Sequence, residues 1–217
     1  PARNGEWYSL VDWGHTKSLT GRYGIVHYFY SPLINYANIK YIVDYKKDDW
    51  RQINEEGLFY PDIKAPRYTE DFYDRRVYIF KNNDALPYIW LTRKFEVAKD
   101  SDELIDKILV SGEPKVILEK NPDLDFNESG LDYKVANIKK LYNEIEFDVV
   151  ASNDSLAFVS ESYYPGWRAY VDGKEEEIFR ANWLFQSIRV PRGEHKIRFV
   201  YFPKSFKIGL WLSLTTF

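Results

Sequence analysis

The segment from 163 to 203 constrains the fold most, because turn sequences divide it into short runs of alternating polarity. Pro-Gly at 165–166, Asp-Gly at 172–173 and Pro-Arg-Gly at 191–193 are typical turn sequences. Between 196 and 202 the residues alternate between two faces, as expected of a pleated strand with one face toward a core. The segment therefore predicts an antiparallel β unit.

Three runs upstream of this unit also predict strands, at 133–138, 144–151 and 156–160. With the closing unit they give about seven short strands, separated by turns every eight to twelve residues. This pattern is typical of a β-sandwich, which we place at 123–207.

Residues 35–122 predict a small α/β subdomain that precedes the sandwich. A nearly continuous apolar run at 39–44 predicts a central strand, and the strands at 76–80 and 87–92 are expected to form a hairpin. Asp100 begins a helix, which is followed by a strand at 115–119. Residues 1–34 form an aromatic-rich N-terminal segment without a sustained period. The predicted fold class is α+β, mainly β, with a C-terminal antiparallel β-sandwich.

Composition excludes some functions. The 217 residues are 45% hydrophobic and 29% charged, which suits a folded body, and the net charge of −3 argues against nucleic acid as a partner. There is no cysteine, so neither a disulfide nor a thiolate metal site is available. The signatures of a GxSxG hydrolase, a phosphate-binding glycine loop and an HExxH protease are also missing.

The candidate binding residues are Tyr163, Tyr164 and Trp167, which flank the Pro-Gly turn. Aromatic rings at a turn can form a platform for a sugar ring or a lipid headgroup. Alternatively, Trp167 fills the core behind the turn and the two tyrosines cover a sheet edge.

We assign no catalytic residue, cofactor or metal site. Asp12, His15 and His27 have no helical period that would bring them together, and His195 is expected to be exposed beside a turn. Asp172 is explained by its preference for a tight hairpin turn. Acidic residues are abundant, but sequence does not give the separation that glycoside chemistry requires.

The chain does not begin with Met, and we expect it to be an excised piece of a longer protein. Residues 208–217 are uncharged and apolar, but a bilayer needs about twenty such residues. We interpret this segment as the start of a truncated transmembrane helix. The alternative is a last buried strand or a short core helix.

The stretches SYYPGWRAYVDGKEEEIFRANWLF at 162–185 and VPRGEHKIRFVYFPKSFKIGL at 190–210 resemble the closing segment of the YfhO-like family of polytopic membrane proteins. That family is similar to the GT-C class of glycosyltransferases, which use lipid-linked sugars. Weaker likenesses precede these stretches: NIKYIVDY at 38–45, RVYIFKNNDALPYIWL at 76–91 and KVILEK at 115–120.

The resemblance implies an extracytoplasmic domain in the cell membrane that caps its own transmembrane domain. It further implies contact with an acceptor glycan or a polyprenyl-phosphate-linked sugar, with the catalytic residues outside this chain. Whether the parent protein transfers sugars stays open. The alternatives are a carbohydrate-binding or protein-interaction sandwich without transferase chemistry, and a glycosidase with two carboxylates in an aromatic cleft.

Overall fold

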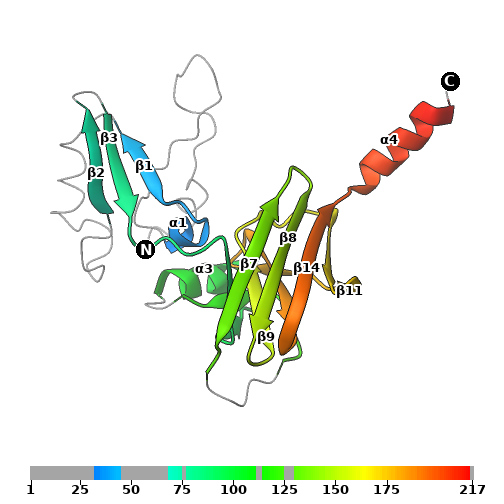
Figure 1. The fold of residues 1–217 in the computed structure, drawn as a ribbon, viewed down its shortest axis with the longest axis horizontal. Coiled ribbons are helices and arrows are strands. Elements are labelled where there is room, and N and C mark those ends of the chain that lie inside the picture. Colours follow the sequence, from blue (N-terminus) through cyan, green and yellow to red (C-terminus); the bar gives the residue numbers. More distant parts are fainter. Residues whose placement is uncertain (1–31, 45–67, 75–76, 111–113, 125–129, 216–217) are drawn as a thin grey trace. The chain divides into compact units, whose positions relative to one another are not determined.

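The computed structural model describes residues 32–44, 68–74, 77–110, 114–124 and 130–215 (Figure 1). The chain divides into two compact units, the first made of 1–35 and 39–85 and the second of 36–38 and 86–217. The N-terminal segment 1–34 lies outside the described residues except for its last three.

The first unit contains a three-stranded antiparallel sheet in the order β1-β3-β2. Its strands are β1 (Tyr41–Asp44), β2 (Tyr68–Asp74) and β3 (Val77–Asn82), and helix α1 (Pro32–Tyr36) precedes them. The strand predicted at 39–44 is confirmed as β1. Among the described strands β1 lies at an edge of the sheet, whereas a central position was expected.

The hairpin predicted between 76–80 and 87–92 is also wrong. Strand β3 pairs with β1 and β2, whereas β4 (Ile89–Thr92) pairs with β9 (Ser155–Val159) in the second unit. All four residues of β4 are buried, and its partner is a fully buried strand far along the chain. Burial of both strands therefore determines the pairing, and the turn-forming residues at 82–84 do not.

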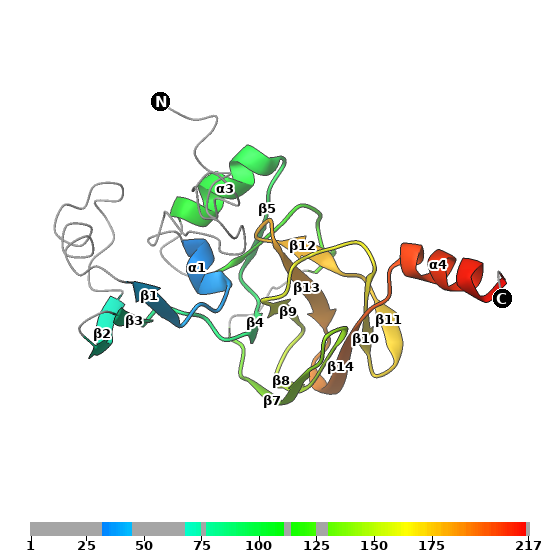
Figure 2. The same cartoon turned by 90° about the horizontal axis from the view of Figure 1, so that it is seen from above.

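The second unit is a sandwich of two sheets, as predicted (Figure 2). The five-stranded antiparallel sheet has the order β11-β10-β14-β8-β7. Its strands, in chain order, are β7 (Tyr133–Lys140), β8 (Glu144–Ala151), β10 (Trp167–Val171), β11 (Lys174–Glu176) and β14 (Gly193–Tyr201).

The six-stranded sheet has the order β4-β9-β13-β12-β6-β5. Besides β4 and β9 it contains β5 (Phe95–Val97), β6 (Val116–Leu118), β12 (Phe179–Ala181) and β13 (Phe185–Val190). Strands β5 and β6 run parallel, joined by helix α3 (Ser101–Val110).

The core lies between the two sheets. The predicted alternation places one face of β8 and one face of β14 in it, and β4, β9, β10 and β13 supply the rest. Its buried members are Ile89, Leu91, Ile145, Phe147, Val149, Ala151, Ala157, Val159, Ala169, Ile188, Val190, Ile197 and Phe199.

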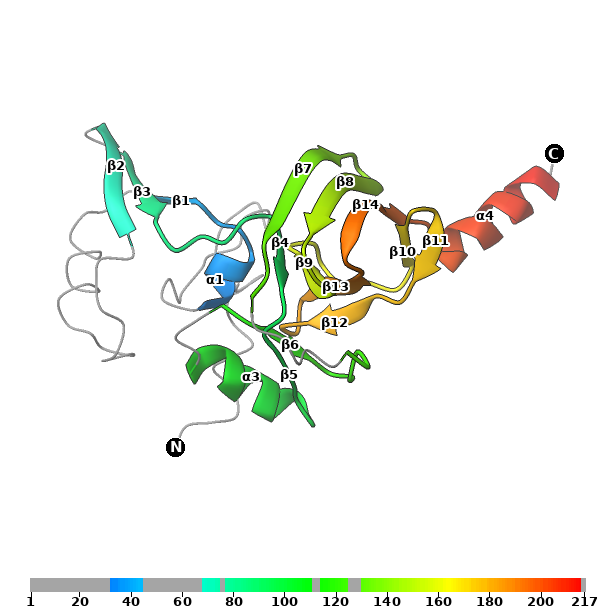
Figure 3. The ribbon, with the colours of Figure 1, turned by 60° about the horizontal axis from the view of Figure 1, so that its bottom comes forward.

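The six-stranded sheet is covered on its other face as well. Helix α3 packs on this face beside β6, and its side chains Leu104 and Ile108 are buried (Figure 3). The ring of Phe158 contacts Trp90 at 5.1 Å between centroids and Phe185 at 5.3 Å. Two covered faces explain why β4, β6 and β9 consist entirely of buried residues.

The chain therefore divides between residues 85 and 86, which differs from the boundary expected near residue 122. The predicted helix and the strands at 87–92 and 115–119 exist, but they belong to the sandwich unit. Strand β6 joins that unit through β12, with Leu118 opposite Ala181. This pairing spans a sequence separation too long for periodicity to detect.

Helix α4 (Lys204–Thr215) follows β14 after two residues. Its side chains Phe206, Ile208, Trp211 and Leu212 are all exposed. Within the described part of the chain, no helix has both the length and the apolar character needed to cross a bilayer. A transmembrane continuation of α4 stays a prediction.

Candidate functional site

An open groove of about 730 Å³ lies where β14 passes into α4, and we call it the aromatic groove. It is formed by the Pro-Gly turn, the first residues of β10 and the junction between β14 and α4. The lining residues are Tyr164, Pro165, Gly166, Trp167, Arg168, Tyr201, Phe202, Pro203 and Ser205.

Gly166 holds the turn against the junction. Its φ of +118° is unfavourable for any residue with a side chain, and a Cβ atom there would lie 3.0 Å from the Cα of Pro203. The amide of Phe202 donates a hydrogen bond of 2.9 Å to the Gly166 carbonyl. The groove wall is thus fixed to the last residues before α4.

The aromatic rings are arranged around Tyr201. The Trp167 and Tyr201 centroids lie 5.3 Å apart, and those of Tyr164 and Tyr201 lie 6.4 Å apart. Tyr164 is 62% exposed, whereas Trp167 is half-buried and packs against the core. Trp167 therefore packs against the core, as one interpretation expected, and also lines the groove; its role in binding stays a prediction.

The structure brings together two of the three predicted binding residues. Tyr164 and Trp167 line the groove, but Tyr163, which is 40% exposed, does not. Its backbone amide instead donates a hydrogen bond of 2.7 Å to the carbonyl of Leu184. Sequence reasoning missed Tyr201, because its place beside Trp167 depends on the pairing of β10 with β14.

Arg168 is the charged residue among the described residues that line the groove. Its Nε and Nη2 donate hydrogen bonds of 2.9 and 3.0 Å to the two carboxylate oxygens of Glu175. Among the described residues of the lining there is no Asp or Glu.

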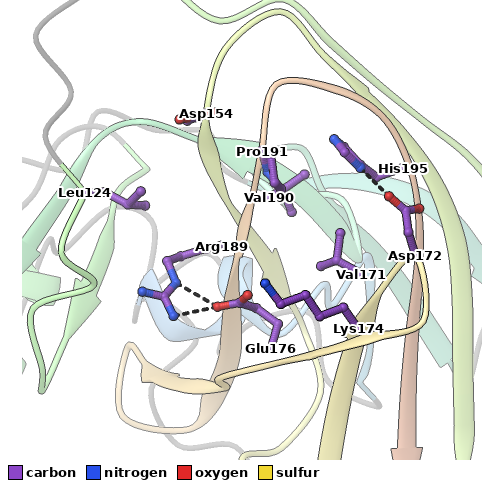
Figure 4. Close-up of a pocket in the computed structure, with 10 residues that line it drawn as sticks. All are labelled: Leu124, Asp154, Val171, Asp172, Lys174, Glu176, Arg189, Val190, Pro191 and His195. Atoms are coloured by element: carbon purple, nitrogen blue, oxygen red, sulfur yellow. Dashed lines mark hydrogen bonds and ion pairs between the residues drawn. The ribbon is translucent and has the colours of Figure 1, made fainter.

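A second, polar pocket of about 420 Å³ lies near the opposite end of β14 (Figure 4). His195 Nδ1 lies 2.7 Å from Asp172 Oδ2, and His195 Nε2 lies 3.3 Å from the Arg192 carbonyl oxygen. The other carboxylate oxygen of Asp172 accepts a 2.8 Å hydrogen bond from the Lys196 amide. His195 was expected to be exposed, but its side chain is only 15% exposed because it packs against this turn.

The electrostatics of this pair favour its charged form. Partial burial opposes the imidazolium, but the hydrogen bonds to Asp172 and to the Arg192 carbonyl outweigh burial and raise the pKa of His195. The same hydrogen bond, together with the Lys196 amide, lowers the pKa of Asp172. Among the described residues that line the pocket there is no Ser, Thr or Cys. The hydrogen bonds of Asp172 to His195 and to the Lys196 amide link the β10–β11 turn to β14.

An ion pair forms the other side of the polar pocket. Arg189 Nη2 and Nε lie 2.6 and 2.7 Å from Glu176 Oε1, and the guanidinium lies 5.5 Å from the centre of the Phe179 ring. These contacts join β13 to β11 and β12. In the described residues no three His, Asp or Glu side chains are grouped to hold a metal, and Asp12, His15 and His27 lie outside them.

The comparisons with known proteins concern the sandwich. Residues 126–213 match the model of a family described as "Bacterial membrane protein YfhO". Over 74 residues the chain is 28% identical to a Bacillus subtilis (strain 168) protein named "Uncharacterized protein YfhO". That alignment covers 34% of this chain and 9% of the relative. No solved structure matches the chain significantly. The matched region contains the aromatic groove and most of α4, and the chain is thus YfhO-like, similar over 126–213 to a family of bacterial membrane proteins.

Proposed function

We propose that this chain is the extracytoplasmic, membrane-proximal domain of a YfhO-like membrane protein, and that its aromatic groove binds a sugar ring. The observation that carries the proposal is the position of the groove at the β14–α4 junction. Pro203, which lines the groove, is the residue immediately before α4.

The exposed apolar residues of α4 support the membrane placement. Along the helix, the exposed fraction is 56% for Phe206, 60% for Ile208, 71% for Trp211 and 61% for Leu212. Apolar residues with an aromatic ring near a helix end are typical of a segment that enters a bilayer. A groove that ends where such a helix begins would lie at the depth of the lipid headgroups.

The chemistry of the groove suits a carbohydrate. Sugar rings have apolar C–H faces that pack on aromatic rings, while their hydroxyls need polar partners at the edge. Trp167 and Tyr201 offer ring faces, and Tyr164 and Arg168 offer polar groups. At headgroup depth, the sugar would belong to an acceptor glycan or to a polyprenyl-phosphate-linked donor.

The domain would act by holding its ligand and capping the membrane domain, without catalysis of its own. The aligned relative extends far beyond the matched region, since that region is 9% of its length. Glycosyl transfer by the parent protein would use residues outside this chain.

The test is binding of the chain, incorporated in lipid nanodiscs, to soluble oligosaccharides and to short-chain polyprenyl-phosphate sugars, measured by calorimetry. Replacing Tyr164 by Ala should weaken binding of the recognised sugar about tenfold, which equals about 1.4 kcal/mol. Tyr133→Ala is the matched control, because Tyr133 is also an exposed tyrosine but does not line the groove.

Equal weakening by both variants, or no binding of any sugar by the unaltered chain, would contradict the glycan proposal. If Tyr164→Ala instead released the domain from its own membrane portion without affecting sugars, the groove would be a protein contact.

A further inference from the structure

The turn between β7 and β8, residues 141–143, exposes two large side chains, and we call it the β7–β8 tip. Leu141 is 62% exposed and Tyr142 is fully exposed, at 107%. The tip is well closed, since the Leu141 amide donates a 2.8 Å hydrogen bond to the carbonyl of Glu144. A leucine and a tyrosine that are adjacent in the chain and held in water by a closed turn form a small exposed apolar surface, and such surface marks contact sites for proteins or membranes when it is contiguous with more.

The tip lies at the end of the sandwich from which α4 leaves. Glu144, the first residue of β8, pairs with Val200 near the end of β14. The amide of Tyr201 donates a 2.8 Å hydrogen bond to the carbonyl of Asn143 in the tip itself. Figure 1 shows this turn and the C-terminal end of β14 at the same end of the sheet.

The turns at the other end of the same sheet have a different composition. Ala151 pairs with Gly193 there, so the Ser-Asn-Asp turn at 152–154 and the Pro-Arg turn at 191–192 lie together. The Asp-Gly turn at 172–173 lies at the same end of the sheet, since the Asp172 amide donates a hydrogen bond to the Lys196 carbonyl near the start of β14. Polar turns at one end and an apolar turn beside α4 make the sandwich asymmetric along its strands.

Basic residues precede the tip. Lys139 and Lys140 are exposed, and the Lys140 ammonium lies 2.7 Å from Glu161 and 4.6 Å from the centre of the Tyr88 ring. Lysine beside exposed leucine and tyrosine is the composition of segments that lie in an anionic membrane interface.

We propose that the β7–β8 tip inserts Leu141 and Tyr142 into the same lipid surface that α4 enters, giving the domain a second membrane contact. The inference rests on the membrane placement proposed above. Two contacts at one end of a rigid sandwich would fix the tilt of the domain and hold the aromatic groove at constant depth.

Single nitroxide labels test this directly, because the chain contains no cysteine and each label site can be introduced alone. Tyr142→Cys reports on the tip, Arg192→Cys on the opposite turn and Trp211→Cys on α4. The chain is bound to vesicles of phosphatidylcholine with phosphatidylglycerol, and collisions of each label with oxygen and with a water-soluble nickel chelate are measured. The labels at 142 and 211 should collide more often with oxygen than with the nickel chelate, whereas the label at 192 should collide more often with the nickel chelate.

A label at 142 that favours nickel while label 211 favours oxygen would overturn the second contact and leave the membrane placement intact. Labels 142 and 211 both favouring nickel would overturn the placement as well. A label at 142 shielded from both reagents would indicate a protein partner and also overturn the inference. As an independent measure, Leu141→Ser with Tyr142→Ser should weaken vesicle binding about tenfold, and Tyr133→Ser should not.

Discussion

Asp172 is at once a turn residue and a partner for His195. Its φ of +51° is followed by +82° at Gly173, the pair of positive values that a type I′ turn requires. The Asp-Gly pair therefore predicted the turn correctly. It could not predict the contact with His195, because that contact depends on the register in which β10 and β14 pair.

The pKa shifts of this pair predict a pH dependence of stability. The raised pKa of His195 means that its contribution is complete below its ordinary pKa of 6.5 and is lost as the pH rises through the raised value. The lowered pKa of Asp172 means that its contribution is complete above 3.8 and is lost as the pH falls through the lowered value. The pair should stabilise the fold most between about pH 4 and 6.5.

We therefore expect the free energy of urea unfolding to decrease from pH 6 to pH 8.5 and Asp172→Asn to flatten that decrease. Since half of the Asp172 side chain is exposed, the effect should be below about 1 kcal/mol. Asp154, which also favours the imidazolium, provides the control, because Asp154→Asn should leave most of the slope. An unchanged slope in Asp172→Asn would show that the pair does not stabilise the fold.

At the level of elements, Asn182 attaches β6 to the six-stranded sheet. Its side chain is fully buried, its Oδ1 accepts a 2.8 Å hydrogen bond from the Ile117 amide, and its Nδ2 donates one of 3.2 Å to the Lys115 carbonyl. Its own amide bonds to the Ile117 carbonyl at 2.8 Å. One asparagine thus continues the sheet where β12 has already ended.

Replacing Asn182 by Ala should lower the free energy of unfolding by about 2–4 kcal/mol, because it leaves buried backbone groups without partners. Asn137→Ala is the matched control, since Asn137 has a φ of +53°, close to the +45° of Asn182, but is exposed and donates a side-chain hydrogen bond to Asp148 at the surface. Its cost should be about 1 kcal/mol or less. Equal costs in denaturant unfolding would mean that backbone conformation, not burial, explains the loss.

Sequence predicted the elements of the sandwich better than their partners. Alternating polarity predicted β8 and β14. Asp100 predicted the start of α3, where the Glu103 amide donates a 2.8 Å hydrogen bond to the Asp100 carboxylate. The place of β4 beside β9 could not be predicted, because a short, fully buried strand carries no signal of which strand it pairs with. Of the residues in the aromatic groove, sequence singled out Tyr164 and Trp167 beside the Pro-Gly turn, but not the facing Tyr201.

For the whole molecule, the notable property is that the sandwich unit is discontinuous in sequence. Residues 36–38 belong to it, although 39–85 form part of the other unit. Tyr36 is buried and packs on Phe158 at 5.7 Å between ring centroids. Its hydroxyl lies 3.2 Å from both the amide and the carbonyl of Lys115, and its carbonyl accepts a hydrogen bond from Ser160. Burial raises the pKa of this phenol, so it stays neutral and can donate.

A shortened chain that begins at residue 86 should consequently have a lower free energy of unfolding than the sandwich in the full chain. Loss of Tyr36 should account for most of the difference. In the full chain, Tyr36→Ala should cost the sandwich about 3–5 kcal/mol by leaving a cavity, and Tyr36→Phe about 1–2 kcal/mol by removing the hydroxyl. Denaturant unfolding followed by amide exchange of β9 residues would isolate the sandwich transition, with Tyr133→Ala as an exposed control. A residue that belongs to the sandwich must contribute to its free energy of unfolding. If Tyr36→Ala lowered that free energy no more than Tyr133→Ala does, segment 36–38 would connect the two units without stabilising the sandwich.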